Sequence, residues 1–509
     1  MKSEINPLGI FIIAVLAFTI LPSATSFNEL APSRLLVSQS DSSTTGVLLK
    51  DVPYVWQEIN GFCFWSSITM ALQYTGYPIT LYDIFALTSM GMSAVYVSTE
   101  ALQMLIPGPN YRQIYQPQYL ETFLGIDYSV VLDNSTEIGA EFALQLDYWN
   151  LEYEIVIGET EAQASLCDSI DAGYPLILFV DPYYLPLEDY DILRILNLHS
   201  SDTGSGHAIL AVGYNSTTEH VWIMDPGAGA LGDEVGYPSD GRWNYTISYT
   251  DLASARAPLG YTAIQITPGS TEPEQFSPDY ATLVYQRLQG FPAAYEIFNV
   301  DPSIVSCGGR AYQQLSKDLE PATLANFLSN LDQDDQILMH LYEQGIILEQ
   351  ALTLQHLAFK AALTRLPRFL QNYDLTNLQF LAQSALPHFD PLSTNACLTA
   401  FDPSSYSSLI KDTFWGIADV FESTGNIQEA LTAHTKNLTL IQQHLNNIGT
   451  AWMAAGLELQ FQKNASMHQP VIIAFLSSSI IGIIIISGAV KLKSKKTSEQ
   501  KPESLPSNA

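Results

Sequence analysis

A single cysteine, Cys63, stands directly before a helix-like apolar segment in the stretch "VWQEINGFCFWSSITMAL", residues 55–72. A cysteine attacks as its thiolate, and because a free thiol has a pKa of about 8.5, that thiolate needs stabilisation. A helix that begins near Cys63 would place the sulfur at the positive end of the helix dipole. A protonated imidazole nearby would stabilise it further. Cys63 is therefore a candidate nucleophile; the alternatives are a buried small residue or half of a disulfide.

The best candidate for the imidazole partner is His207. Of the nine histidines, only His199, His207 and His220 lie in the first half of the chain. His199 and His220 lie in polar, loop-like sequence that is typical of surface histidines. His207 begins the strand-like segment "HAILAVGYN" after "GSG", which favours a place at a strand end that faces an open cleft.

Two more polar residues complete a candidate catalytic set. Asp225 follows His207 in "VWIMDPG", and antiparallel strands joined by "NSTTE" would bring both residues to the same end of the pair. There the carboxylate could fix the tautomer of the imidazole. Gln57, six residues before Cys63, could donate its side-chain amide to the oxyanion of a tetrahedral intermediate, together with the backbone N–H of Cys63.

The elements that must position these residues predict an α+β domain over residues 48–268. A helix from Cys63 ends at Gly76, and it is followed by four antiparallel strand candidates, "YPLILFVDP", "HAILAVGYN", "HVWIMDPG" and "GYTAIQITP". Residues 269–468 predict an all-α domain. Within it, residues 427–459 carry an apolar heptad pattern, typical of a helix inside a bundle or of a stalk that self-associates.

Both ends of the chain carry apolar segments. Residues 1–26 predict a signal peptide, with an uncleaved anchor as the alternative, and residues 27–47 predict a linker. Residues 469–490 predict one transmembrane helix, because residues 471–490 hold no charge and can span a bilayer. The lysine-rich tail, residues 491–509, predicts the cytoplasmic side. We therefore expect a single-pass type I protein of the cell membrane, with the α+β domain outside.

Composition narrows the partners and the cofactors. The net charge of −31 argues against nucleic acid or anionic lipid as a partner. Because no Cys-X-X-Cys pair occurs and the histidines are scattered, we expect no structural zinc and no cofactor. Five glycosylation sequons fit an extracellular glycoprotein, at Asn134, Asn215, Asn244, Asn437 and Asn464.

The four cysteines allow two disulfides outside the cell. Cys307 and Cys397 bracket a helical region and could pair with each other. Cys63 and Cys167 would then be a second bridge or two free thiols.

The segments "DVPYVWQEINGFCFWSSITMALQYTGYPIT" and "GHAILAVGYN…VWIMDP" resemble the papain-like cysteine peptidase family C39 and its C39-like relatives, over roughly residues 48–268. The shared features are a Val-Pro-Tyr lead-in, a Gln six residues before the Cys, then a His, a Gly-Tyr strand end and an Asp-Pro. The early part is also similar to the N-terminal domain of the butirosin-biosynthesis acyltransferases, papain-like proteins that use a Cys thioester.

The resemblance implies that Cys63 is the nucleophile, His207 the general base and acid, Asp225 its orienting partner and Gln57 part of the oxyanion hole. One departure is Phe64, where C39 peptidases usually have Gly. A bulky residue there would narrow the cleft, so the family's Gly-Gly leader specificity is not carried over.

The predicted function is that of a membrane-anchored extracellular thiol hydrolase of peptide or amide bonds, with a peptide or protein as substrate. One alternative keeps the thioester and replaces water with an amine, giving an acyltransferase or amidase. Another is a non-catalytic binding module on a helical stalk, in which a Cys63–Cys167 disulfide would consume the nucleophile.

Overall fold

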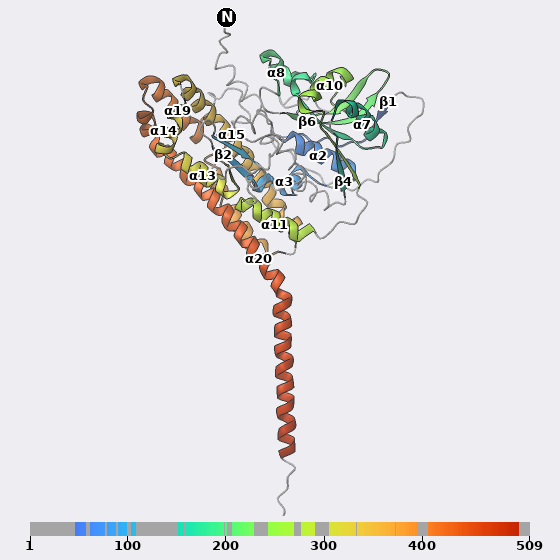
Figure 1. The fold of residues 1–509 in the computed structure, drawn as a ribbon, viewed down its shortest axis with the longest axis vertical. Coiled ribbons are helices and arrows are strands. Elements are labelled where there is room, and N and C mark those ends of the chain that lie inside the picture. Colours follow the sequence, from blue (N-terminus) through green and yellow to red (C-terminus); the bar gives the residue numbers. More distant parts are fainter. Residues whose placement is uncertain are drawn as a thin grey trace, which may run out of the picture.

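The computed structural model describes most of the chain between Gly46 and Thr497 (Figure 1). Within that span the description omits residues 58–61, 77–78, 88–89, 99–102, 108–150, 157, 198, 201–205, 229–242, 269–275, 291–304, 332, 372 and 395–405. Side chains of the last helix are described up to residue 464. The predicted signal peptide, most of the linker and the end of the basic tail lie outside the described residues.

A seven-stranded antiparallel sheet forms the centre of the first half. Its strand order is β4 (Leu151–Val156), β9 (Ala263–Pro268), β5 (Leu176–Val180), β6 (His207–Asn215), β7 (His220–Met224) and β8 (Tyr245–Ser248), and β1 (Gly46–Leu48) pairs with β6. All four predicted strands are present in it. The apolar runs of β5 and β6 are buried along nearly their whole length, as expected for central strands.

Helix α2 (Cys63–Tyr74) packs on β6 and β5. It begins at Cys63 and ends before Gly76, whose φ of 96° favours glycine. Two further helices, α7 (Glu159–Asp171) and α10 (Tyr249–Arg256), also contact the sheet. The predicted α+β class and the predicted start of this helix at Cys63 are therefore confirmed.

A second, three-stranded sheet joins the two halves of the chain. Its order is β10 (Val305–Cys307), β2 (Ala94–Ser98) and β3 (Gln103–Pro107), all antiparallel. Because β10 follows the predicted boundary at residue 268 by more than 30 residues, the helical half contributes a strand to the first half.

The described residues of the second half are otherwise mainly helical. Its helices are α11 (Phe276–Gln289), α13 (Gly309–Asp318), α14 (Pro321–Ser329), α15 (Asp334–Phe369), α16 (Leu375–Gln383), α17 (Leu386–Phe389), α19 (Leu409–Thr424) and α20 (Ile427–Thr497). The long α15 packs on α3 (Leu81–Leu87) of the first half as well as on α19. One cluster of buried apolar residues runs through both halves, so this region packs against the α+β half rather than forming a separate stalk.

The heptad pattern of residues 427–459 lies in the first part of α20. Its apolar positions from Leu431 to Leu459 are almost fully buried against α11, α13, α16 and α19. The bundle interpretation is therefore confirmed. The chain's own helices cover this apolar face, and self-association through residues 427–459 stays a prediction.

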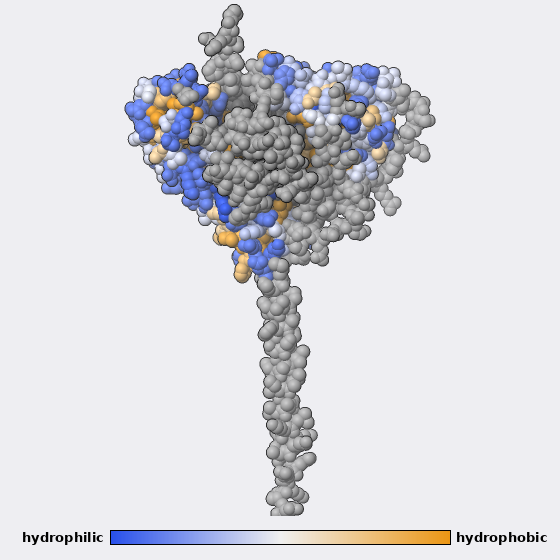
Figure 2. Space-filling model, in the orientation of Figure 1, coloured by the Kyte–Doolittle hydropathy of each residue, from blue (hydrophilic) through white to orange (hydrophobic). Residues whose placement is uncertain are grey.

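Helix α20 continues past the folded body to Thr497 (Figure 1). Among the residues whose side chains are described, no helix is apolar over a length that would cross a membrane. The predicted span at residues 471–490 lies outside those residues and stays a prediction. Figure 2 shows hydrophobic residues near the point where α20 leaves the body. Leu457 and Phe461 of α20 are exposed.

Candidate active site

The sulfur of Cys63 stands at the first residue of α2, where the backbone N–H groups are not used by the helix itself. The side chain is half-buried and forms no disulfide. One turn further along α2, the Ser67 hydroxyl donates to the carbonyl of Ala208 at 3.3 Å. This contact fastens the helix to the strand residue directly after His207.

His207 and Asp225 meet as the hairpin geometry predicts. Strands β6 and β7 are antiparallel neighbours, so the first residue of β6 and the residue after β7 share one end of the sheet. His207 Nε2 lies 2.7 Å from Asp225 Oδ1. His207 is 8% exposed and Asp225 is fully buried. With Nε2 on the carboxylate, Nδ1 is the ring nitrogen left for the thiol.

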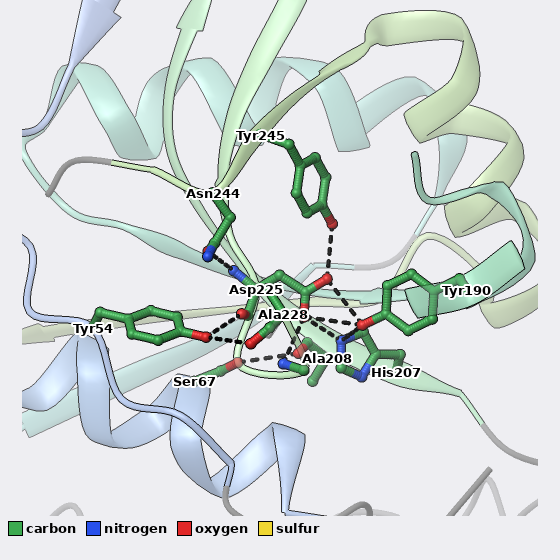
Figure 3. A network of polar contacts seen from close by, with 10 residues as sticks. Tyr54, Ser67, Tyr190, His207, Ala208, Asp225, Ala228, Asn244 and Tyr245 are labelled. Atoms are coloured by element: carbon green, nitrogen blue, oxygen red, sulfur yellow. Dashed lines mark hydrogen bonds and ion pairs between the residues drawn. The ribbon is translucent and has the colours of Figure 1, made fainter. Parts of the chain in front are cut away.

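Three further donor groups contact the Asp225 carboxylate, and Figure 3 shows the two tyrosines among them. The Tyr190 hydroxyl lies 3.2 and 3.1 Å from its two oxygens, Tyr245 donates to Oδ2 at 3.0 Å, and the backbone N–H of Gly227 donates to Oδ1 at 2.8 Å. The backbone N–H of Asp225 donates to Asn244 Oδ1 at 2.6 Å. The buried carboxylate is thus surrounded by donors, as a buried charge requires.

His207 and Cys63 each stabilise the charged form of the other. Burial lowers the pKa of His207, but the charges of Asp225 and Cys63 and hydrogen bonds to both outweigh it and raise this pKa to about 10. Burial raises the pKa of the Cys63 thiol, but the charge of His207 and hydrogen bonds from His207 and from the Ala208 and Phe64 backbone bring it below its usual value. The arrangement therefore favours a thiolate beside an imidazolium.

Gln57 lies next to the turn that carries Asp225. Its backbone N–H donates to the carbonyl of Pro226 at 3.0 Å, and its side chain is 4% exposed. Tyr54, three residues earlier, donates to the carbonyls of Asp225 and Ala228, both at 3.0 Å (Figure 3). The segment before α2 is therefore fixed to the Asp-Pro-Gly turn. The oxyanion role of Gln57 stays a prediction.

Phe64, the departure from the C39 pattern, packs on the sheet. Its ring centroid lies 5.4 Å from that of Phe179 in β5 and 5.0 Å from that of Trp65. The large side chain thus contributes to the packing of α2 on the sheet, next to Cys63 in the chain.

Three predictions from the sequence need correction or completion. His199 is not an ordinary surface histidine, because its Nδ1 lies 3.3 Å from the fully buried Asp181. The sequon at Asn244 is a poor glycosylation site in the folded protein. Its side chain is buried and accepts a hydrogen bond from the backbone N–H of Asp225. The predicted disulfide between Cys307 and Cys397 stays a prediction, because Cys397 lies outside the described residues.

Sequence reasoning missed Tyr190 and Tyr245. Tyr190 ends the short turn Glu188–Tyr190, in a segment without a regular pattern. Tyr245 begins β8 and pairs with Ile223, two residues before Asp225. The alternating segment "NYTIS" was the signal that could have revealed this strand and its tyrosine.

A metal site is not indicated in the part of the chain that the structure describes. There, no group of three or more His, Cys, Asp and Glu side chains is arranged to hold an ion. The side chains that meet at the candidate site are a thiol, an imidazole and a buried carboxylate.

The comparison with protein families agrees with the resemblance seen in the sequence. Residues 49–254, about two fifths of the chain, match the model of the Peptidase_C39 like family. Among solved structures, a match is the crystal structure of a candidate C39-like peptidase from Bacillus anthracis. It is 16% identical, with a TM-score of 0.26, and the match covers 44% of this chain and 99% of that one. The comparison with curated proteins found no match.

Proposed function

We propose that the protein is a cysteine peptidase that hydrolyses peptide or amide bonds with Cys63, His207 and Asp225. The observation that carries the proposal is a thiol at a helix N-terminus whose pKa is lowered by a histidine held 2.7 Å from a buried carboxylate. The match to the C39-like family supports the same class of reaction.

The reaction would proceed through a thioester. The Cys63 thiolate attacks the substrate carbonyl, and the side-chain amide of Gln57 and the backbone N–H of Cys63 stabilise the oxyanion. The His207 imidazolium gives its Nδ1 proton to the leaving amine as the C–N bond breaks. Neutral His207 then takes a proton from water, which attacks the thioester, releases the acid product and regenerates the thiolate.

Asp225 would act through the imidazole rather than on the substrate. Because it is fully buried and bonded to Nε2, it fixes the ring with Nδ1 toward the sulfur and stabilises the imidazolium. It is thus a positioning residue, while Cys63 and His207 touch the reacting atoms.

Two observations weigh against a pure binding module. Cys63 and Cys167 are both free thiols, so the disulfide that would consume the nucleophile is not formed. A module without catalysis would also have no need to lower the pKa of a thiol by placing it beside a histidine.

The proposed setting rests on the sequence. We propose that residues 471–490 anchor the enzyme and that the signal-like residues 1–26 direct the C39-like domain to the outside of the cell. Substrates would then be extracellular peptides or proteins. Protease protection in membrane vesicles, read with antibodies to each terminus, tests this orientation.

The activity itself is tested by digestion of a peptide library with the full-length protein in detergent, read by mass spectrometry. We expect cleavage by the wild type and by Cys167→Ser, and none by Cys63→Ser. Equal cleavage by Cys63→Ser would overturn the proposal, as would the absence of both cleavage and an acyl-enzyme. Added hydroxylamine, which intercepts a thioester, would show whether an amine acceptor competes with water.

A further inference from the structure

We infer that Tyr190 is a positioning residue that holds the His207 imidazole against Asp225 and toward Cys63. The inference rests on the proposed function. The Tyr190 hydroxyl lies 3.0 Å from His207 Nε2 and also contacts both carboxylate oxygens of Asp225 (Figure 3). It is thus in contact with both members of the pair.

The chemistry of a phenol suits this place. The hydroxyl has a single proton, which it donates to the carboxylate, while its oxygen keeps lone pairs that can face an N–H. Since Nε2 carries its proton toward Asp225, the phenol oxygen forms a second contact for that same N–H. Rotation of the ring about its Cβ–Cγ bond would break both contacts at once, so the ring stays with Nδ1 toward the sulfur.

The segment that carries Tyr190 is closed by its own hydrogen bonds. Asp181, directly after β5, accepts from the backbone N–H groups of Tyr183 at 3.0 Å and Ser200 at 3.1 Å, which ties its two ends together. Between them, the Arg194 guanidinium donates to the carbonyls of Leu185 and Leu187. A loop whose backbone is held in this way places its side chains with little freedom.

Gly227 leaves the space that the phenol needs. A Cβ at this position would lie 2.6 Å from the Tyr190 hydroxyl oxygen, 3.2 Å from Asp225 Oδ1 and 3.2 Å from the Cε1 of His207. The "DPG" segment therefore serves two purposes: it supplies the carboxylate, and its glycine lets the tyrosine approach the pair.

Tyr245 offers a matched control within the same site. Its hydroxyl donates to Asp225 Oδ2 at 3.0 Å, and Figure 3 marks no contact between Tyr245 and His207. Tyr190→Phe and Tyr245→Phe each remove one hydroxyl and one donor to the same carboxylate while keeping the ring. Only the first removes a contact with the imidazole.

The test is the rate of Cys63 alkylation by iodoacetamide between pH 4 and 9 in the full-length protein carrying Cys167→Ser. We expect Tyr190→Phe to lower the rate at pH 6 by about tenfold, because a rise of one unit in the thiol pKa reduces the thiolate tenfold. Tyr245→Phe should stay within about twofold of the parent on the same scale. Gly227→Ala, which displaces the phenol, should behave as Tyr190→Phe does.

Equal profiles for the two tyrosine variants would overturn the inference and leave the proposed function standing, since both residues would then serve only the carboxylate. A parent protein with the profile of an ordinary thiol would overturn the proposed function together with the inference.

Discussion

Asp225→Asn tests the electrostatic basis of the site, because it removes the charge and keeps the size. Burial alone would lower the pKa of His207 below 6.5, yet it is raised to about 10, with Asp225 as the largest raising influence. At about 1.4 kcal/mol for each tenfold change in ionisation, this represents about 5 kcal/mol in favour of the imidazolium. A neighbouring opposite charge typically accounts for about 1–3 pH units of such a change.

We therefore expect the His207 pKa to fall by about 1–3 pH units in the Asn variant. The turnover number, kcat, at neutral pH should fall by about 10²–10⁴-fold, as when an orienting carboxylate is replaced in other triads. The pKa is measured by an NMR titration of the histidine ring protons, with His207→Ala to assign the resonance. The turnover is measured on the best peptide from the library.

A matched control is Asp318→Asn, which removes another buried carboxylate, held by the Tyr96 hydroxyl at 2.9 Å in the link between α13 and β2. It should leave the His207 pKa and kcat unchanged. A His207 pKa that stays near 10 in Asp225→Asn would refute the reasoning, because the carboxylate would then not be what stabilises the imidazolium.

Three further predictions concern the pH profile, the oxyanion and the joint between the halves. As the pH increases, kcat/KM should rise at a pH below the usual thiol pKa, because the pKa of Cys63 is lowered. It should fall again near pH 10, where His207 loses its proton. Gln57→Ala should lower kcat by about 10²–10³-fold and leave the alkylation profile of Cys63 unchanged. Asp83→Ala should reduce the free energy of unfolding in urea by about 1–3 kcal/mol, because the buried carboxylate caps α3 and pairs with Arg368 of α15 at 3.1 Å.

Each of these has a clear contrary result. If kcat/KM rose with pH only near the ordinary thiol pKa of about 8.5, that profile would contradict the Cys63–His207 ion pair. A Gln57→Ala variant with full kcat would remove the oxyanion assignment, and an unchanged urea midpoint in Asp83→Ala would show that the contact between α3 and α15 contributes no net stability.

The positions of the proposed nucleophile and of its partners could be predicted from the sequence because each is marked by local signals. Cys63 begins a mostly apolar helix, His207 begins the first strand of a hairpin, and Asp225 directly follows the second strand. Strand length and the turn between β6 and β7 are encoded within about 20 residues, so the contact follows from the pairing of neighbouring strands.

The parts that were missed depend on contacts between distant segments. Tyr190 reaches the site through an irregular loop whose shape is set by Asp181 and Arg194, and no periodicity reveals such a loop. Val305 pairs with Val97 across more than 200 residues, and short apolar runs of this kind do not distinguish strand from helix. The packing of α15 on α3 is likewise a tertiary contact, so the helical half was predicted as a domain apart.

The central claim is that His207 activates the Cys63 thiolate. The most direct measurement compares the alkylation rate of Cys63 at pH 6 in the wild type and in His207→Ala, with both proteins shown to be folded by circular dichroism. The ion pair predicts that the wild type reacts at least about tenfold faster, because the variant returns to an ordinary thiol that is almost wholly protonated at this pH. Equal rates in the two proteins would contradict it.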